Sequence, residues 1–415
     1  MRTARFSGLL AFLGAASLQA QPAKAPPCAP DNAGLTLPKG FCAILVAEGL
    51  RSPRHLVVAA NGDVFFAQAG RTGGGVVALR DTTGDGKADV VAKFFEGAGG
   101  SGIALSSDAL YYAPNDQVLR FPWKPGALAP TGPADTIAQG LPIDGHDAKG
   151  IVLGPNGALF VSFGSLTNSC LPKGVDRTAT RQPAPNPCTE LEHRAGVWRF
   201  DARKKNQTPA DAKRWATGLR NPMSVSLQPG TGMLYAGVHG RDGLGLQWGY
   251  SDEENAENPA ETVFALTEGT DGGWPYCYFD SRKKVRLQNP EYGGDGTKVG
   301  DCDSRMAMPA ISFPGHWAPD ATLFYNGAQF PAAYRGGLFI AFHGSWNRAP
   351  LPQEGYRVAF APFKNGKAVG TYETFAAPSG NPLSIRPSGL AVGPDGSLYI
   401  GADAQGKIWR VFYRP

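Results

Sequence analysis

A short pattern, a polar turn followed by a β-prone segment, recurs six times along this chain. Each copy begins with a turn rich in glycine, asparagine or aspartate and continues with four to six residues of high β propensity. The turns supply the positive φ angles that tight hairpins need, and the alternating segments supply a face that can be buried. The copies lie at residues 59–69, 106–115, 154–165, 228–240, 334–345 and 393–404.

These six hairpins predict an all-β fold, a six-bladed β-propeller, because each repeated hairpin would bury its faces on its neighbours. The intervals between copies range from under 50 to over 100 residues, and we attribute the long ones to insertions, chiefly at 166–195 and 241–333. No segment shows convincing helical periodicity. The last strand, "KIWRVFY", is expected to pair with an N-terminal strand such as "FCAILVA" and so close the ring. The alternative is a β-sandwich in which the likeness of the hairpins is accidental.

The composition is typical of a turn-rich folded protein. Glycine (55) and proline (35) together exceed a fifth of the 415 residues, and the hydrophobic share of 42% is ample for a core. The chain is therefore not expected to be disordered. The formal net charge is +5 and no run of lysine and arginine occurs, which argues against a nucleic-acid partner.

The N-terminus has the pattern of an export signal. Residues 1–21 begin with two arginines, continue with the apolar stretch "GLLAFLGAASL" and end in small residues. This pattern is typical of a signal peptide and is too short for a membrane span; the alternative is a buried N-terminal helix. We expect a loose lead-in at 22–37, a propeller domain at 38–415, no membrane span, and a periplasmic or secreted protein.

Six cysteines follow the predicted signal peptide: Cys28, Cys42, Cys170, Cys188, Cys277 and Cys302. An even number of cysteines in an exported chain predicts disulfides, for which 15 pairings are possible. Pairing of sequence neighbours is favoured because each bond would close a local loop. The chain has no CxxC or CxxCH motif, which removes the usual zinc, thiol-redox and covalent haem spacings.

One hairpin carries polar residues at both of its ends. In "RNPMSVSLQPGTGMLYAGVHGRDGLG" (residues 220–245), Arg220 and Asn221 precede the first strand, and His239 to Asp242 follow the second. A surface hairpin needs none of these groups, whereas a site built on loops at the rim of a sheet does.

Another polar stretch, "DTTGDGKAD" (81–89), resembles a calcium loop. It lacks the final glutamate and the flanking helices of an EF-hand, so we expect a polar turn between strands.

Further motifs follow one another along the chain: "GHDAKGIVLGPNGALFVSFGS", "GLRNP", "HGRDGLG", "NPAE", "GWPYCY", "HGSWNR" and "RPSGLAVGPDGSLYIGAD". In this order they resemble the soluble glucose/sorbosone dehydrogenase family, most closely its sorbosone dehydrogenase-like branch, over about residues 38–413. The resemblance implies a six-bladed propeller that uses pyrroloquinoline quinone (PQQ) and calcium. It also implies oxidation of a sugar, a sugar aldehyde (osone) or another aldehyde outside the cytoplasm, with an external electron acceptor such as a cytochrome or a quinone.

The resemblance gives several residues a role. His146, ahead of the third hairpin, matches the general base that takes the substrate's hydroxyl proton while hydride moves to the C5 carbon of the quinone. A histidine suits this role because its pKa lies near working pH. Without the resemblance, the residues alone favour a histidine that is simply hydrogen-bonded in a loop. Arg220 and Asn221 match the pair beside the quinone oxygens, where a guanidinium stabilises developing charge. Gly240 and Arg241 match the positions whose backbone carbonyls bind calcium.

The remaining cofactor contacts depart from the family pattern. Arg386 matches an arginine that binds the PQQ carboxylates, which guanidinium groups pair in a fork. Many relatives also use a lysine after the preceding blade's strand, where this chain reads "LFIAFHGSWNR". His343 and Arg348 are the candidate replacements for that lysine, and Trp346 is a candidate for stacking on the flat cofactor.

A second departure concerns the group that orients His146. The glucose-oxidising relatives have an acid after the strand that matches "LFVSF", whereas this chain has Gly164 and Ser165. We expect Asp144 or Asp147 to orient the histidine instead, or the histidine to be less basic. This departure argues against glucose as the substrate.

Other functions stay open on the residues alone. The missing lysine and acid favour a non-catalytic propeller that binds glycan or protein ligands. A metal-dependent lactonase on a similar propeller would need side-chain carboxylates that converge on the central channel. Asp242 is either an extra calcium ligand or a surface charge, and His239 or His343 is the alternative base. The pairing of His146 with Arg220 and Asn221 favours the dehydrogenase, although a propeller fold alone fixes no function.

Overall fold

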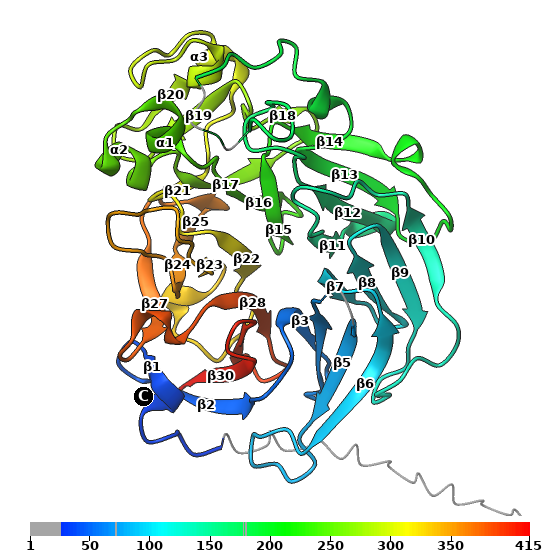
Figure 1. Ribbon diagram of the computed structural model, residues 1–415. Coiled ribbons are helices and arrows are strands. Elements are labelled where there is room, and N and C mark those ends of the chain that lie inside the picture. Colours follow the sequence, from blue (N-terminus) through cyan, green and yellow to red (C-terminus); the bar gives the residue numbers. More distant parts are fainter. Residues whose placement is uncertain (1–25, 71–72, 177, 179–180) are drawn as a thin grey trace, which may run out of the picture.

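The computed structural model describes residues 26–70, 73–176, 178 and 181–415. The signal peptide predicted for 1–21 lies outside the described residues. The chain forms six sheets of four antiparallel strands arranged in a ring, and two of them carry a fifth, short edge strand (Figure 1). The predicted six-bladed β-propeller is confirmed.

The first three blades follow one another along the chain. The first contains β3 (Pro53–Val58), β4 (Val64–Gln68), β5 (Gly74–Arg80) and β6 (Val90–Gly97). The second contains β7 (Gly100–Leu105), β8 (Ala109–Pro114), β9 (Gln117–Pro122) and β10 (Asp135–Gln139). The third contains β11 (Ile151–Leu153), β12 (Ala158–Phe163), β13 (Gly196–Asp201), β14 (Lys213–Thr217) and the parallel edge strand β18 (Thr270–Asp271).

The other three blades complete the ring. The fourth contains β15 (Asn221–Leu227), β16 (Leu234–His239), β17 (Glu261–Leu266) and β21 (Ile311–Phe313). The fifth contains β22 (Pro319–Phe324), β23 (Leu338–Phe342), β24 (Arg357–Ala361), β27 (Glu373–Pro378) and the edge strand β1 (Leu35–Thr36). The sixth contains β28 (Pro387–Val392), β29 (Leu398–Ala402), β30 (Lys407–Tyr413) and β2 (Phe41–Ala47).

The N-terminal strand β2 closes the ring by joining the last blade. It pairs antiparallel with β30, with Phe41 opposite Tyr413 and Leu45 opposite Trp409 (blue beside red in Figure 1). This is the predicted pairing of "FCAILVA" with "KIWRVFY". The two ends of the propeller are therefore held in one sheet.

Strands with two apolar faces build a core between each pair of neighbouring blades. In β8, Tyr111 packs into the cluster shared with the third blade, and Tyr112 packs into the cluster shared with the first. Phe65 and Phe66 of β4 face the second and the sixth blade in the same way. Because successive residues of a strand point to opposite faces, such a strand must lie between two other sheets. A closed ring of blades satisfies this requirement for every sheet.

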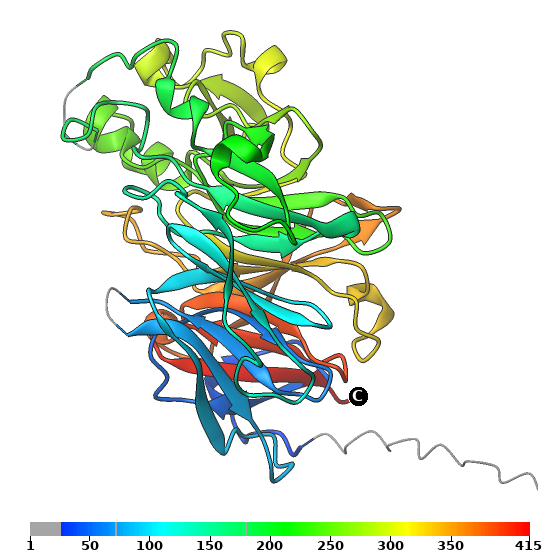
Figure 2. The ribbon, with the colours of Figure 1, turned by 90° about the vertical axis from the view of Figure 1, so that its right-hand side faces the viewer.

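Additional segments lie outside the blades. They include the short helices α1 (Leu244–Trp248), α2 (Asp252–Glu257) and α3 (Cys302–Arg305), and the ribbons β19 (Cys277–Asp280) with β20 (Val285–Gln288) and β25 (Phe363–Lys364) with β26 (Lys367–Ala368). In Figure 2 the segments coloured green and yellow extend past the blades at the top of the view.

The interval 241–333 is not a single insertion, contrary to the prediction. It also contains β17, β21 and β22, which belong to the fourth and fifth blades. β17 and β21 are outer strands without the turn that marks the inner hairpins, and β21 has three residues. β22 is the first strand of the fifth blade's inner hairpin. The three helices have at most six residues, too few for a helical period to be detected.

Three disulfides join Cys28 to Cys42, Cys170 to Cys188 and Cys277 to Cys302. The predicted pairing of sequence neighbours is confirmed. The first bond fastens the N-terminal segment to β2, and the other two close loops outside the blades. No described helix is long and apolar enough to cross a membrane.

The stretch 81–89 is a polar turn between β5 and β6, as predicted. Asp81 Oδ1 accepts a hydrogen bond from the Gly84 backbone N–H at 2.7 Å, and Asp89 Oδ2 accepts one from the Thr82 N–H at 2.8 Å. The carboxylates that resembled calcium ligands therefore hold the turn itself.

Candidate active site

A cavity of about 310 Å³ opens at one end of the propeller, where loops at the ends of the inner strands gather. It brings together seven of the residues predicted from the sequence: His146, Arg220, Asn221, Gly240, His343, Trp346 and Arg386. These residues come from the third, fourth, fifth and sixth blades. The site is therefore created by the ring and not by any one segment.

The inner hairpin of the fourth blade places its two polar ends side by side. Asn221 is the first residue of β15 and His239 is the last residue of β16, and the two lie opposite each other in the sheet register. Asn221 Nδ2 is 3.4 Å from His239 Nδ1. The polar groups before and after this hairpin thus share one rim of the propeller, as the sequence predicted.

Arg220 is 4% exposed and is held in one orientation by hydrogen bonds. Its Nη1 donates to the Gly240 carbonyl at 2.7 Å, and its Nη2 donates to Asp242 Oδ2 at 3.0 Å. Asn168 accepts two further bonds, from Nε at 3.2 Å and from Nη2 at 2.9 Å. The guanidinium is therefore a fixed positive charge at the cavity wall. Asp242 is its ion-pair partner within the cavity, not the surface charge that the sequence left open.

His146 is oriented by Ser165. Its Nδ1 lies 2.9 Å from the Ser165 carbonyl oxygen and 3.1 Å from the Ser165 hydroxyl. Because a carbonyl oxygen can only accept, Nδ1 carries the hydrogen and Nε2 keeps its lone pair. Neither Asp144 nor Asp147 hydrogen-bonds to the ring within the described residues, so a backbone carbonyl takes the place of the expected acid.

The surroundings of His146 keep its ring neutral. Burial, followed by the charge of Arg220, lowers the pKa of His146 to about 3. Gly164 packs directly against this residue, because a Cβ at position 164 would lie 2.4 Å from His146 Cβ and 2.6 Å from its carbonyl oxygen. A longer side chain at position 164 cannot fit while the histidine keeps this position.

A buried lysine that the sequence analysis did not single out closes the loop that carries His146. Lys149 Nζ donates to the carbonyl of Pro142 at 2.9 Å and also to the carbonyl of Asp147. Burial lowers the pKa of Lys149 to about 7. Its bonds join the two ends of the segment 142–149, and they position the histidine within it.

Arg386 lies on the sixth-blade side of the cavity. Its Nε donates to the His343 carbonyl at 3.0 Å and its Nη2 to the Gly344 carbonyl at 2.6 Å. Its Nη1 has no hydrogen-bond partner among the described residues. The ring of Trp346, which is 71% exposed, has its centroid 6.0 Å from Arg386 Cζ. This corner of the cavity therefore offers an available donor beside an exposed flat ring.

A charged network behind His343 was not predicted from the sequence. Asp403 Oδ1 lies 2.9 Å from His343 Nε2, and Arg54 contacts both Asp403 at 2.6 Å and Asp320 at 3.0 Å. Asp320 in turn lies 3.2 Å from His239 Nε2. Burial alone would raise the pKa of Asp320, because it disfavours the charged carboxylate. The charge of Arg54 and the interactions with His343 and His239 together have a larger effect, so the pKa of Asp320 is lowered.

Two further titratable residues of the cavity wall also escaped the sequence analysis. Glu261, the last residue of the "NPAE" motif, accepts hydrogen bonds from the backbone of Gly240 at 3.0 Å and of Ala318 at 3.3 Å. Burial raises the pKa of Glu261. His316 Nδ1 lies 3.3 Å from Asp242 Oδ1. Burial opposes a charge on His316, but the hydrogen bond and the charge of Asp242 outweigh it and raise its pKa.

Two predicted arginines have side chains that bind the protein itself. Arg241 Nη1 contacts the Glu291 carboxylate at 2.5 and 2.6 Å, which leaves its backbone as the candidate ligand. Arg348 does not line the cavity; its Nη1 donates to the carbonyls of Ala256 and Gly315 at 2.6 and 3.0 Å. Arg348 thus ties its loop to α2, and it is not retained as a cofactor contact.

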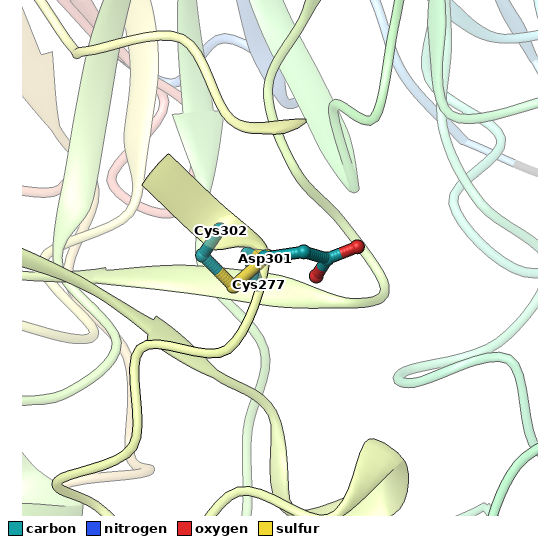
Figure 3. A group of neighbouring side chains, drawn as sticks. All are labelled: Cys277, Asp301 and Cys302. Carbon is teal, nitrogen blue, oxygen red and sulfur yellow. A yellow bond between two sulfur atoms is a disulfide. The ribbon is translucent and has the colours of Figure 1, made fainter. Parts of the chain in front are cut away.

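Cys277, Asp301 and Cys302 form a compact group of potential metal ligands, with their ligand atoms within 4.8 Å of one another. The two sulfurs are bonded to each other, and the Asp301 carboxylate extends away from them (Figure 3). A disulfide offers no thiolate to a metal. This group is therefore structural.

The channel between the inner strands is a cavity of about 510 Å³. Aliphatic side chains from all six blades border it, including Leu56, Ile103, Ile151, Val225, Leu323 and Leu390. No carboxylate borders it among the described residues. The channel therefore gives no support to a lactonase, which would need converging acids there.

Fold and site together define a six-bladed propeller with a charged cavity built on the loops of four blades. The chain belongs to the TrAA12-like family, whose profile matches residues 35–414. It is 30% identical over 205 residues to an uncharacterised protein of Borreliella burgdorferi, and this matched region covers 48% of each chain. It is 25% identical over 227 residues to the pyrroloquinoline quinone-dependent pyranose dehydrogenase of Coprinopsis cinerea, and this matched region covers 46% of this chain and 30% of the relative. The matches thus span less than half the length of these relatives.

Solved structures with the same fold include the holo form of a PQQ domain and the calcium structure of an enzyme. The holo form of the PQQ domain of pyranose dehydrogenase from Coprinopsis cinerea has a TM-score of 0.73 at 18% identity, over 91% of this chain and 97% of that one. The calcium structure of a Trichoderma reesei family AA12 enzyme has a TM-score of 0.76 at 18% identity, over 92% and 97%. The resemblance to PQQ-dependent sugar dehydrogenases is confirmed at the level of family and fold; the sorbosone-like branch stays a prediction.

Proposed function

We propose that this protein is an exported, PQQ- and calcium-dependent oxidoreductase that oxidises a sugar, a sugar aldehyde (osone) or another aldehyde. The observation that carries the proposal is the meeting of His146, Arg220 and Arg386 in one cavity. His146 offers a neutral, oriented nitrogen, and the two arginines offer fixed positive charge. A general base beside preorganised charge is what oxidation of a hydroxyl group requires.

The residues of the cavity fit PQQ, a flat molecule with three carboxylates. Arg386 keeps Nη1 as a donor beside the exposed ring of Trp346, so a carboxylate and a flat ring would be bound at one corner. Arg220 and Asn221, on the fourth-blade rim, would hold the quinone oxygens. His343, whose Nε2 lies 2.9 Å from Asp403, would take the place of the family's lysine. When bound, PQQ supplies the hydride acceptor that amino-acid side chains lack.

The backbone carbonyls of Gly240 and Arg241 are the proposed calcium ligands. The Gly240 carbonyl accepts one hydrogen bond from Arg220 and has a second lone pair for a cation. Asp242 and Glu261 place further carboxylate oxygens in the same cavity. Calcium takes six to eight oxygen ligands, so the quinone oxygens and water would complete its shell.

His146 would take the substrate's hydroxyl proton at Nε2. The bond from Nδ1–H to the Ser165 carbonyl fixes the tautomer that leaves Nε2 free for this purpose. Because the pKa of His146 is lowered to about 3, the ring is ready to accept a proton but is a weak base. Stabilisation of the developing negative charge by Arg220 would compensate for that weakness.

The relatives and the disulfides support the proposed chemistry and location. One relative is named a pyrroloquinoline quinone-dependent pyranose dehydrogenase, and one structural neighbour was solved with calcium. Three disulfides suit an oxidising compartment, which agrees with a periplasmic or secreted enzyme. Electrons would leave to an external acceptor such as a cytochrome or a quinone.

The proposal is tested by titrating the cofactor-free protein with PQQ, followed by absorbance, first with calcium and then with a chelator. Each should raise the other's affinity, because binding linkage is reciprocal. Arg386→Gln should weaken PQQ binding, whereas Arg335→Gln, which does not line the cavity, should not. Dye reduction is then measured on a panel of aldoses and aldehydes. Equal PQQ affinity with and without calcium would exclude a shared site, and PQQ binding without dye reduction would favour a non-catalytic propeller.

A further inference from the structure

A second cavity, of about 330 Å³, adjoins the candidate active site. It lies between the loop after β23 and the segment after β16 that contains α1 and α2. Asp242, Trp346 and Asn347 border both cavities. A ligand that occupies the first cavity and continues past Trp346 would therefore enter the second. We call the second one the insertion cavity.

The border of the insertion cavity is held by hydrogen bonds within the protein. Asn347 Nδ2 donates to Asp242 Oδ1 at 2.7 Å, and Asn255 Nδ2 donates to the Asn347 carbonyl at 3.2 Å. Asn255 Oδ1 accepts a bond from the Gly245 backbone N–H at 2.8 Å. These contacts join the insertion to the loop after β23, so the cavity is formed before any ligand binds, which lowers the entropic cost of binding.

The walls combine ring surfaces with polar groups. Trp346 and Leu246 are 71% and 68% exposed, and Tyr250 adds a second ring. Large exposed apolar side chains at the edge of a cavity are typical of ligand sites. The exposed carboxylate of Asp252 lies among them, and Asn255 keeps one amide hydrogen and one lone pair beyond its bonds to Asn347 and Gly245. Rings pack on the C–H faces of a sugar, and amides and carboxylates pair with its hydroxyls.

We propose that the insertion cavity binds the second sugar unit of a disaccharide or longer saccharide whose terminal unit occupies the His146 cavity. The inference rests on the proposed function, which places the reacting unit beside His146. A saccharide is favoured over a wholly apolar ligand because polar groups are interspersed with the rings. It is favoured over a metal ion because Asp242 is already paired with Arg220.

The test is isothermal titration calorimetry of the cofactor-free protein and of the PQQ- and calcium-loaded protein with glucose, maltose and cellobiose. We expect at least one disaccharide to bind tenfold or more tightly than glucose. Tyr250→Ala should remove most of this difference. Asp252→Ala, at an exposed position, should reduce it without disturbing the fold. Leu383→Ala, at a residue that is exposed but lines neither cavity, is the matched control and should change nothing.

Equal affinity for glucose and both disaccharides would overturn the inference, as would a gain in disaccharide affinity that survives both Tyr250→Ala and Asp252→Ala. Turnover gives a second readout on the loaded enzyme, where the two variants should lower kcat/KM for the disaccharide and leave that for a monosaccharide substrate unchanged. Failure of the proposed function is recognised separately, because it abolishes calcium-dependent PQQ binding in the wild-type protein. Such a failure would leave the calorimetric comparison of the sugars intact.

Discussion

A methyl group added at Gly164 would displace His146, on which the proposed chemistry depends. In Gly164→Ala the new Cβ would lie 2.4 Å from His146 Cβ and 2.6 Å from its carbonyl oxygen. Carbon atoms in contact are about 3.5–4.0 Å apart, so the histidine must move by about 1 Å. A displacement of this size costs catalysis roughly 10²-fold, and overpacking a filled site lowers the free energy of unfolding by about 1–3 kcal/mol.

The assay compares turnover of the PQQ- and calcium-loaded variant with its urea unfolding midpoint. Gly132→Ala is the matched control, because a Cβ there would meet no atom closer than 3.7 Å, in Pro122. The control should behave as wild type in both measurements. If Gly164→Ala unfolds earlier but turns over at the wild-type rate, the position of His146 does not govern catalysis. If neither property changes, the close packing of Gly164 against His146 is refuted.

Arg220→Ala should weaken both PQQ binding, measured by titration, and turnover, measured by dye reduction, because the side chain is expected to contact the quinone and the developing charge. A loss confined to one of the two would contradict that dual role. Acidification should destabilise the fold through His146, whose pKa is about 3 in the folded protein and 6.5 in the unfolded chain. Between these two pH values the unfolded chain binds a proton that the folded protein does not. The free energy of unfolding therefore falls as the pH falls, by up to about 1.4 kcal/mol per pH unit. His146→Gln should flatten this part of the pH profile of urea unfolding, and an unchanged slope would argue against the low pKa. Removing the second insertion disulfide in Cys277→Ala/Cys302→Ala should lower the free energy of unfolding by about 2–4 kcal/mol; an unaltered unfolding curve would show that the bond does not stabilise the fold.

The blade count could be predicted from the sequence because every blade begins with the same inner hairpin. The turn that joins its two strands needs glycine, asparagine or aspartate, and this chemistry leaves a readable trace. In the fourth blade, the outer strands are joined by longer loops without that constraint. For this reason β17 and β21 were hidden within the interval 241–333.

The candidate site was predictable where side-chain chemistry carries the role, as for His146, Arg220 and Arg386. Backbone roles leave no such trace, since every residue has a carbonyl; this is why Ser165 was not predicted as the partner of His146. Nor does sequence tell which arginine is already engaged. Arg386 matched the family pattern and Arg348 was a candidate for the missing lysine, yet the carbonyls and carboxylate around α2 bind Arg348.

Residues brought together across the ring were the hardest to predict. Arg54 lies in the first blade, Asp320 in the fifth and Asp403 after the second strand of the sixth. The 2.6 Å pair of Arg54 with Asp403 exists because ring closure places the first blade beside the sixth. The 3.0 Å pair of Arg54 with Asp320 joins the inner strands of the first and fifth blades. No local pattern marks any of the three.

Replacing His146 by glutamine tests most directly whether this residue is the general base. Glutamine keeps a polar side chain but cannot accept a proton at neutral pH. PQQ affinity, measured by absorbance with calcium present, should stay at the wild-type value, while turnover on a substrate from the panel should fall by roughly 10²–10⁴-fold. Turnover at the wild-type rate would contradict the mechanism, and the role of base would then pass to His239 or His343.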